Sequence, residues 1–334
     1  MVLLFILQNI TFLSHLYYKN ITFFRQLTFY LILLYFATIQ FTKNVIICQF
    51  IVSNFRTSSY YTIREVFKLK KIKKGDIVGR ISYGKDIIFI VDRIIELNNH
   101  TQIAILKGLT MRIKADSLLD DLEHIDKRII KSSEKSIEDR ILTHLSKYTK
   151  RLRKKYNYGR VLHLDGDSRY SQKSVRYYRD LGITAIVKNV SETRQPFVVK
   201  GLLNKYKPDV LVVTGHDGMI KRGTGFNDIY NYRHSAYFVK TVINAREWEN
   251  HSNNLAIFAG ACQSYYEALI QAGANFASSP ARILIDFVDP LIVAENIAIT
   301  DRRKFITIKD FENDLRDGQK GISGIGVFGK KLFT

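Results

Sequence analysis

Residues 211–218 read LVVTGHDG, an aliphatic run that ends in glycine, histidine, aspartate and glycine. The same pattern returns 46 positions further on, counted from His216 to Cys262, where residues 255–264 read LAIFAGACQS. Near-continuous aliphatic runs of this length are typical of strands that are buried on both faces, as in a parallel sheet. Each predicted strand therefore carries a reactive side chain, an imidazole or a thiol, just beyond its carboxyl end.

Both runs belong to a longer alternation of strand-like and helix-like segments over residues 158–300. Further strands are predicted around residues 159–167, 183–190 and 282–290, and amphipathic segments that favour helices lie between the runs. This alternation predicts an α/β domain over 158–334, with a mainly parallel sheet covered by helices on both faces. Function on such a sheet lies at the carboxyl ends of the strands.

The part of the chain before this domain has a different pattern. Residues 69–125 hold short β-branched runs separated by turn signals, which predict a small all-β module, of the SH3 type, with the role of a structural adaptor. Residues 126–157 follow as a basic helical linker, with eleven Lys or Arg and four acids between 126 and 155. Helical spacing places Ile137, Ile141, Leu142 and Leu145 on one side of it. A solvated basic helix is the default interpretation, and a docking site for an acidic partner is the alternative.

The first 68 residues form a hydrophobic leader with an unusual composition. Residues 1–62 contain no Asp, Glu, Gly or Pro, and Glu65 is the first acid of the chain. A membrane span requires about 20 mainly apolar residues, and the longest uncharged run, 26–42, is interrupted by polar side chains. No small-residue cleavage site marks a secretory signal. The composition favours translated upstream sequence, with the protein starting near Leu69, and then no membrane partner is expected.

Charge and cysteine usage limit the classes of function. The formal net charge of +20 favours acidic partners, although much of the excess lies in the basic linker. The chain has two cysteines, Cys48 and Cys262, which are too few and too far apart for a disulfide framework or a zinc site. The sequence therefore predicts a protein of a reducing interior that needs no cofactor or metal.

The chemistry at the predicted rim of the sheet is that of a cysteine nucleophile. Small residues before Cys262 let a substrate approach, and a following helix is expected to direct its N-terminus at the sulfur and favour the thiolate. His216 on the neighbouring strand can take the thiol proton or protonate a leaving amine. The backbone amides of Gly218 and Cys262 are candidates for an oxyanion hole. The alternative is a buried structural thiol and a loop histidine.

The layout of strand plus histidine, followed by strand plus Ala-Cys, resembles the caspase-like clan of cysteine peptidases. More closely, residues 161–167 (VLHLDGD), 209–218 (DVLVVTGHDG), 255–280 (LAIFAGACQSYYEALIQAGANFASSP) and 73–80 (KKGDIVGR) resemble the YabG family of sporulation-specific proteases. The resemblance implies a caspase-like fold and a His216–Cys262 dyad. It also implies a peptidase of the mother-cell cytoplasm, later of the spore coat, that processes spore coat and cortex-associated proteins. Asp217 stands where the clan has the glycine that follows the histidine.

The acids at the rim allow two interpretations each. Asp165 and Asp167 end the first strand, where the resemblance implies the group that reads the residue before the scissile bond. A carboxylate in this S1 position pairs with arginine through a charge-assisted contact, so cleavage after Arg is expected. The alternative is that the two acids cap a tight turn at Gly166. Asp217 is either an orienting partner of His216 or a turn acid.

Two other classes of function remain open from the sequence. A metal-dependent hydrolase would use His163, Asp165, Asp167, His216 and Asp217 to hold Mg²⁺ or Mn²⁺. A basic nucleic-acid-binding protein would use the β module and the basic helix, with an affinity that falls steeply with salt. Neither explains why Cys262, the single cysteine of the globular part, follows a strand, so no nucleic-acid partner is expected.

Overall fold

The computed structural model describes residues 71–97, 100–149, 157–220, 225–250 and 254–332. The leader, the start near Leu69 and Cys48 all lie outside these residues, so they remain predictions. Residues 72–334 form one compact unit, which holds everything described below. No helix among the described residues is long and apolar enough to cross a membrane.

A six-stranded sheet forms the centre of the unit, in the order β12-β10-β9-β8-β6-β7. Five neighbouring strands are parallel, and β12 pairs with β10 antiparallel at one edge. The predicted α/β fold with a mainly parallel sheet is therefore confirmed. The strands are β6 (Val161–Asp165), β7 (Ala185–Asn189), β8 (Val210–Thr214), β9 (Ala256–Ala259), β10 (Phe276–Ser278) and β12 (Ile322–Gly324).

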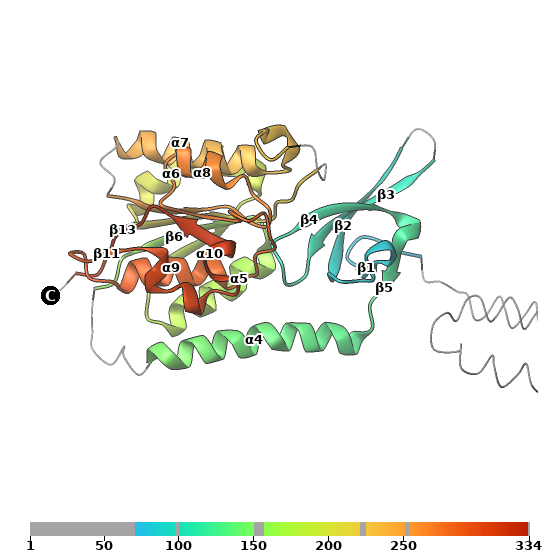
Figure 1. Ribbon diagram of the computed structural model, residues 1–334, viewed down its shortest axis with the longest axis horizontal. Coiled ribbons are helices and arrows are strands. Elements are labelled where there is room, and N and C mark those ends of the chain that lie inside the picture. The colour runs from blue at the N-terminus through green and yellow to red at the C-terminus, as the bar shows by residue number, and fades with distance from the viewer. Residues whose placement is uncertain (1–70, 98–99, 150–156, 221–224, 251–253, 333–334) are drawn as a thin grey trace, which may run out of the picture. The chain divides into compact units, whose positions relative to one another are not determined.

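Helices cover both faces of this sheet (Figure 1). Alternation along β8 shows why its whole length is apolar: Val210 and Val212 face one core, and Leu211 and Val213 face the other. Helices α5 and α9 pack on the first face, and α6, α7 and α8 pack on the second. Their bounds are α5 (Ser168–Asp180), α6 (Gln195–Tyr206), α7 (Ser235–Glu249), α8 (Tyr266–Gln271) and α9 (Asp289–Ile299).

The fifth strand of the sheet is not the predicted one. Residues 282–290 were expected to form it, but β10 takes that place and pairs with β9. The stretch around Ile285 instead runs extended beyond the sheet, where its backbone bonds with Arg112 and with the Cys262 side chain. The apolar run 282–290 therefore lines the site described below, because its backbone groups form hydrogen bonds outside the sheet.

The module before the sheet is all-β, as predicted. Five antiparallel strands follow the order β4-β3-β2-β1-β5, and the likeness to an SH3 barrel remains a prediction. Its core of Val78, Phe89 and Leu106 continues into Cys262 and Ile285 of the α/β domain, so the two parts share one apolar cluster. The strands are β1 (Ile77–Arg80), β2 (Phe89–Glu96), β3 (Gln102–Gly108), β4 (Lys114–Leu118) and β5 (Leu122–His124).

The basic segment forms helix α4 (Lys127–Thr149), which is not a free solvated helix. Ile137 and Leu145 are buried against the core of the α/β domain, and Ile141 packs there partly buried. Leu142 is 63% exposed, so its predicted place on the apolar side is wrong. Polar contacts add to the docking, with Arg140 bonded to Asp286 and Asp289, His144 to Glu295, and Lys147 to Asp314.

Short elements complete the unit. A two-stranded pair and one short helix follow α9: β11 (Phe305–Ile306), β13 (Val327–Phe328) and α10 (Gly318–Gly321). The 3₁₀ turns are η1 (Ile81–Tyr83), η2 (Leu119–Asp121), η3 (Glu192–Arg194), η4 (Ile229–Asn231), η5 (Ile308–Asp310) and η6 (Glu312–Asp314).

Candidate active site

Strand register brings the predicted residues to one edge of the sheet. Asp165 at the end of β6 pairs with Thr214 at the end of β8, two residues before His216. Val213 pairs with Ala259 at the end of β9, three residues before Cys262. Because all three strands are parallel, the chain leaves them on the same side.

His216 is fully buried and held through its backbone and its ring face. Its amide donates to Glu192 Oε1 at 2.8 Å, and its ring stacks on Tyr170 with centroids 5.4 Å apart. A β-carbon on the preceding Gly215 would lie 2.4 Å from the same Glu192 oxygen, so a larger residue there would displace the Glu192 side chain. Nε2 lies 3.4 Å from Gly108 O, and Nδ1 has no hydrogen-bond partner. Burial lowers the pKa of His216, although Asp167 opposes that shift, so the ring is held as a neutral base.

Cys262 is also fully buried, and it lies against the extended segment at Ile285. The turn from β9 uses Gly260 at φ +112°, a conformation that favours glycine. The thiol donates to Ile285 O at 3.3 Å and accepts from the Ile285 amide at 3.0 Å. Burial raises the pKa of Cys262 to about 12. The expected thiolate is therefore wrong for this state, since α8 begins only at Tyr266 and apolar side chains surround the sulfur.

Two backbone amides converge on a single carbonyl oxygen beside these residues. The amides of Asp217 and Cys262 donate to Arg112 O at 3.1 and 3.2 Å. The Gly218 amide, which the sequence predicts as the second donor, donates instead to Asp217 Oδ1 at 2.9 Å. The residue directly after His216 thus supplies the donor, and the geometry is that of an oxyanion hole already occupied by a peptide carbonyl.

Asp165 and Asp167 have different surroundings, although they are two residues apart. Asp165 is fully buried and accepts from Arg112 Nη1 at 3.0 Å. Burial alone would raise the pKa of Asp165, but the Arg112 and His163 contacts hold it well below its usual range. Asp167 caps the N-terminus of α5, accepts from the Arg169 amide at 2.8 Å, and lies 3.8 Å from His216 Nε2. The pocket interpretation fits Asp165, and the capping interpretation fits Asp167.

Asp217 organises the loop after β8 rather than the imidazole of His216. Its Oδ1 accepts from the amides of Gly218 and His234, and its Oδ2 accepts from the hydroxyls of Ser235 and Ser264 at 2.5 and 2.9 Å. Burial raises the pKa of Asp217 because no cation compensates its charge fully. These bonds fix the backbone that presents the Asp217 amide.

Four further residues at the site were not identified from the sequence. Arg112 lies in a loop of the β module, Glu192 in a 3₁₀ turn, Tyr170 in α5 and His234 before α7. His234 Nδ1 lies 2.6 Å from His216 O and supports the loop after β8 from outside. Glu192 and Tyr170 come shortly after the predicted strands 183–190 and 159–167, but no local motif marks their roles, and the tertiary fold brings all four residues to the rim.

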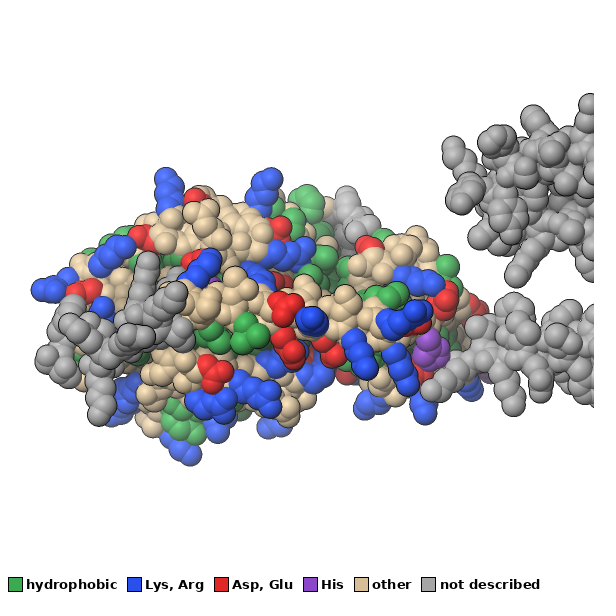
Figure 2. All heavy atoms as spheres, turned by 90° about the horizontal axis from the view of Figure 1, so that it is seen from below, with side chains coloured by type: hydrophobic (Ala, Val, Ile, Leu, Met, Phe, Trp, Pro, Cys, Tyr) green, Lys and Arg blue, Asp and Glu red, His purple; other side chains and the backbone are tan. Residues whose placement is uncertain are grey.

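The alternative functions find little support in the geometry. Among the described residues, no group of three or more His, Cys, Asp or Glu side chains could hold a metal ion. Asp165 and Asp217 are already engaged by Arg112 and by serine hydroxyls. Figure 2 shows one face of the molecule, on which Lys and Arg side chains are interspersed with acidic ones rather than gathered into one basic surface.

Comparison with known proteins gives a family for most of the chain. Residues 73–332 match the family described as YabG peptidase U57. The sporulation-specific protease YabG of Bacillus subtilis (strain 168) is 38% identical over 274 residues, which cover 76% of this chain and 94% of that protein. No solved structure matches the chain.

Proposed function

The chain belongs to the YabG peptidase family, and from that premise we propose that it is a sporulation-associated cysteine endopeptidase that cleaves after arginine. Cys262 is the nucleophile and His216 the acid and base. The observation that carries this proposal is the convergence of the Asp217 and Cys262 amides on one carbonyl oxygen, 3.1 and 3.2 Å away. Two such donors stabilise the oxyanion that forms when a thiolate attacks a peptide carbonyl.

The proposed mechanism needs three steps from these groups. His216, whose Nδ1 is without a partner, takes the thiol proton of Cys262 and later gives it to the leaving amine. The amides of Asp217 and Cys262 hold the oxyanion. Water then hydrolyses the thioester and restores the thiol.

Arginine specificity is supported by the surroundings of Asp165. The pocket around this carboxylate already accepts a guanidinium, which is wholly buried and bonded at 3.0 Å. The ring of Tyr170 lies 4.8 Å from the guanidinium carbon and adds a cation–π contact. A substrate arginine would find the same charge and the same aromatic wall.

The substrates that we propose are spore coat and cortex-associated proteins, met in the mother cell and then at the spore coat. The name of the B. subtilis relative, a sporulation-specific protease, supports the setting. Incubation of a spore-coat extract with the active protein and with Cys262→Ala, followed by sequencing of new termini, identifies which proteins are cut and after which residue.

The test of the dyad uses a peptide with one arginine, with and without EDTA. We expect Cys262→Ala to abolish cleavage. His216→Ala should lose cleavage but still react slowly with a small alkylating agent, because the thiol remains. If Cys262→Ala cleaves normally, or EDTA alone stops the reaction, the metal hydrolase takes the place of the peptidase.

The test of specificity compares matched peptides with Arg or Gln before the cut. Asp165→Asn should reduce the Arg preference in kcat/KM by about 30-fold or more, because a buried guanidinium loses its charged partner. Asp167→Asn is the matched control, since this acid caps α5 outside the pocket. A clear preference for apolar residues before the cut would remove the arginine assignment.

A further inference from the structure

The two amides that converge on Arg112 O belong to peptide groups whose oxygens are bonded as well. The Asp217 amide shares its peptide group with His216 O, and the Cys262 amide shares its own with Ala261 O. Both peptide groups are trans, so the C=O and N–H groups of each point in opposite directions. A side chain that donates to the oxygen therefore lies behind the amide, on the side away from the oxyanion position.

His234 is the donor behind the Asp217 amide. Its Nδ1 lies 2.6 Å from His216 O, and since a carbonyl oxygen can only accept, Nδ1 carries a proton and donates it. The His234 amide donates to Asp217 Oδ1 at 2.8 Å, and Nε2 lies 3.5 Å from Lys114 Nζ. The His234 side chain is 9% exposed, so water hardly competes for His216 O. These contacts fix the direction in which the ring donates.

Ser278 is the donor behind the Cys262 amide. Its hydroxyl donates to Ala261 O at 2.8 Å from the end of β10, and the residue is fully buried. The hydroxyl carries a single hydrogen, which this bond uses. A β-carbon on Gly260 would overlap Ser278 Oγ. Glycine in the turn after β9 therefore permits this contact.

The same arrangement thus occurs at two peptide groups from different parts of the chain. Buried carbonyl oxygens need donors in any fold, so a structural role would explain either bond alone. A structural role does not require both bonds to fall on the two peptide groups whose amides converge. A bond to the oxygen polarises a peptide group and strengthens donation by its N–H group, most of all in a buried site of low dielectric constant.

We propose that His234 and Ser278 are positioning residues of the oxyanion hole, which aim and polarise the Asp217 and Cys262 amides. The inference rests on the proposed function. As the Cys262 thiolate adds to the substrate carbonyl carbon, the carbonyl electron pair moves to the oxygen, which then lies between the two amides. The negative charge on this oxygen develops only on the way to the tetrahedral intermediate, so better donors lower the activation barrier more than they strengthen substrate binding.

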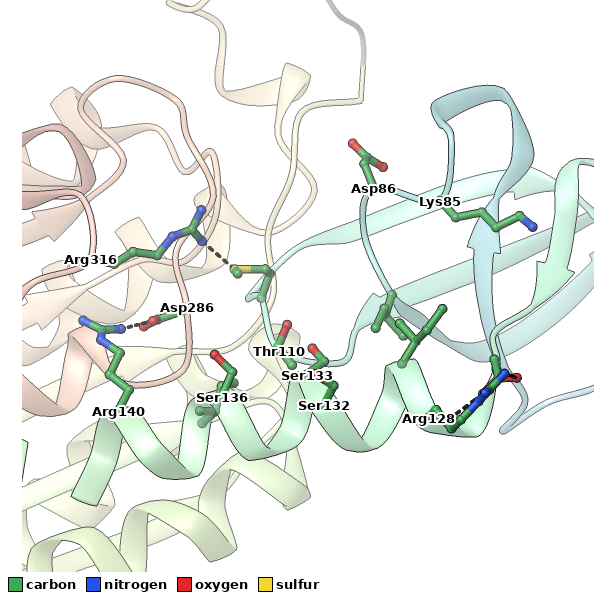
Figure 3. A pocket seen from close by; sticks show the side chains of 15 residues that line it. Lys85, Asp86, Thr110, Arg128, Ser132, Ser133, Ser136, Arg140, Asp286 and Arg316 are labelled. Atoms are coloured by element: carbon green, nitrogen blue, oxygen red, sulfur yellow. Dashed lines mark hydrogen bonds and ion pairs between the residues drawn. The ribbon is translucent and has the colours of Figure 1, made fainter. Parts of the chain in front are cut away.

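The two residues act behind the site and not along the path of the substrate. A cavity of about 940 Å³ opens along the loop between β3 and β4, at Met111, and Arg140 and Arg316 form part of its wall (Figure 3). Neither His234 nor Ser278 is among the described residues that line this cavity. Changes at either residue should therefore lower kcat and leave KM nearly unchanged.

The first test removes the hydroxyl behind the Cys262 amide. Ser278→Ala should lower kcat on an arginine peptide by about 10-fold or more, because loss of a whole oxyanion donor costs about 100-fold or more. Ser174→Ala is the matched control, since this hydroxyl is equally buried and donates to Tyr170 O at 2.8 Å, within helix α5. Both variants should lose a similar free energy of unfolding, and Ser278→Ala alone should lose kcat.

The second test separates the N–H donor of His234 from the bulk of its ring. His234→Leu should lower kcat by about 10-fold or more, since the Asp217 amide loses the bond behind it. His234→Asn should keep most of the parent kcat, because its NH₂ group is attached at the position of Nδ1. His234→Gln carries its NH₂ group one carbon further along the side chain and should behave like His234→Leu. Equal losses in all three variants would reduce the role of His234 to packing and overturn its part of the inference.

A peptide aldehyde that ends in arginine measures the oxyanion hole without turnover. The Cys262 thiol adds across the aldehyde C=O bond and places the oxygen in the hole, so the Kd should rise by the factor by which kcat falls. The inference is overturned if Ser278→Ala and His234→Leu keep the parent kcat and aldehyde affinity, or if Ser174→Ala loses as much kcat as Ser278→Ala. If the parent neither cleaves the peptide nor binds the aldehyde, the proposed function itself fails, and the inference fails with it.

Discussion

Two buried carboxylates at the same edge of the sheet are held in opposite ways. Asp165 bonds a guanidinium that comes from the five-stranded module, 53 residues earlier in the chain. Asp217 bonds two serine hydroxyls and two backbone amides of its own domain. Accordingly the pKa of Asp165 lies below its usual range, whereas burial raises that of Asp217.

Under the proposed function, the difference separates a recognition pocket, at Asp165, from a scaffold, at Asp217. Asp165 is stabilised by a charge that arrives from outside its domain, so another arginine can supply the same charge. Asp217 is stabilised by fixed neutral groups, so it keeps the loop that presents its own amide in place. The predictions below compare the free energy of unfolding of each variant with that of its parent.

The largest effect is expected at the ion pair. Asp165→Asn should lower the free energy of unfolding by about 3–5 kcal/mol, because it leaves the Arg112 guanidinium buried without a counter-charge. Adding Arg112→Met should recover a large part of this loss, since the buried charge disappears as well. Denaturant unfolding at neutral pH measures both variants. A loss below about 1 kcal/mol would show that water reaches the pocket.

A smaller loss is expected at the scaffold carboxylate. Asp217→Asn should cost about 1–2 kcal/mol, because the amide oxygen keeps the backbone donors and its NH₂ group can bond the Ser235 and Ser264 oxygens. Asp217→Ala is the sharper control and should cost about twice as much. If Asp217→Asn were as damaging as Asp165→Asn, the charge of Asp217 would matter and the contrast between the two acids would be lost.

The pH dependence of stability should run in opposite directions for the two acids. Asp165 has a lowered pKa, so its contribution is present above about 4 and is lost as the pH falls below the ordinary value of 3.8. Asp217 has a raised pKa, so the folded protein takes up its proton first and the wild-type carboxyl gains stability as the pH falls towards 4.

Unfolding from pH 7 to pH 3.5 tests this contrast. The advantage of the parent over Asp165→Asn should shrink by about 0.5 kcal/mol at the acid end, and its advantage over Asp217→Asn should grow. Parallel curves for the two variants would mean that neither carboxyl has a different pKa in the folded state and in the unfolded state.

The smallest effect is expected at the third acid of the rim. Asp167→Asn keeps the cap of α5, because asparagine also accepts from backbone amides, and should cost less than about 1 kcal/mol. It removes the charge 3.8 Å from His216 Nε2, so the pKa of that imidazole should fall further. A histidine titration followed by NMR measures this shift, and an unchanged pKa would separate Asp167 from the site altogether.

The sequence predicted the sheet well because its signal is local. Val210 to Val213 alternate between two apolar cores along β8, and a strand buried on both faces leaves an uninterrupted aliphatic pattern. The run at 282–290 carries the same pattern without pairing in the sheet, since apolar content alone does not say which backbone will lie beside it. Leu142 was misplaced for a similar reason: helical spacing does not fix how wide the buried stripe is.

The sequence by itself determined that Asp165, His216 and Cys262 meet at one edge, because parallel strands end on the same side of a sheet. Only the tertiary structure decided what covers that edge: a loop of the β module, with Arg112 in the Asp165 pocket and its carbonyl between the Asp217 and Cys262 amides. The physical reason is range. A strand leaves a pattern in neighbouring residues, which can be recognised in the sequence. A contact between two modules depends on how their cores pack together, and no periodicity along the chain predicts that contact.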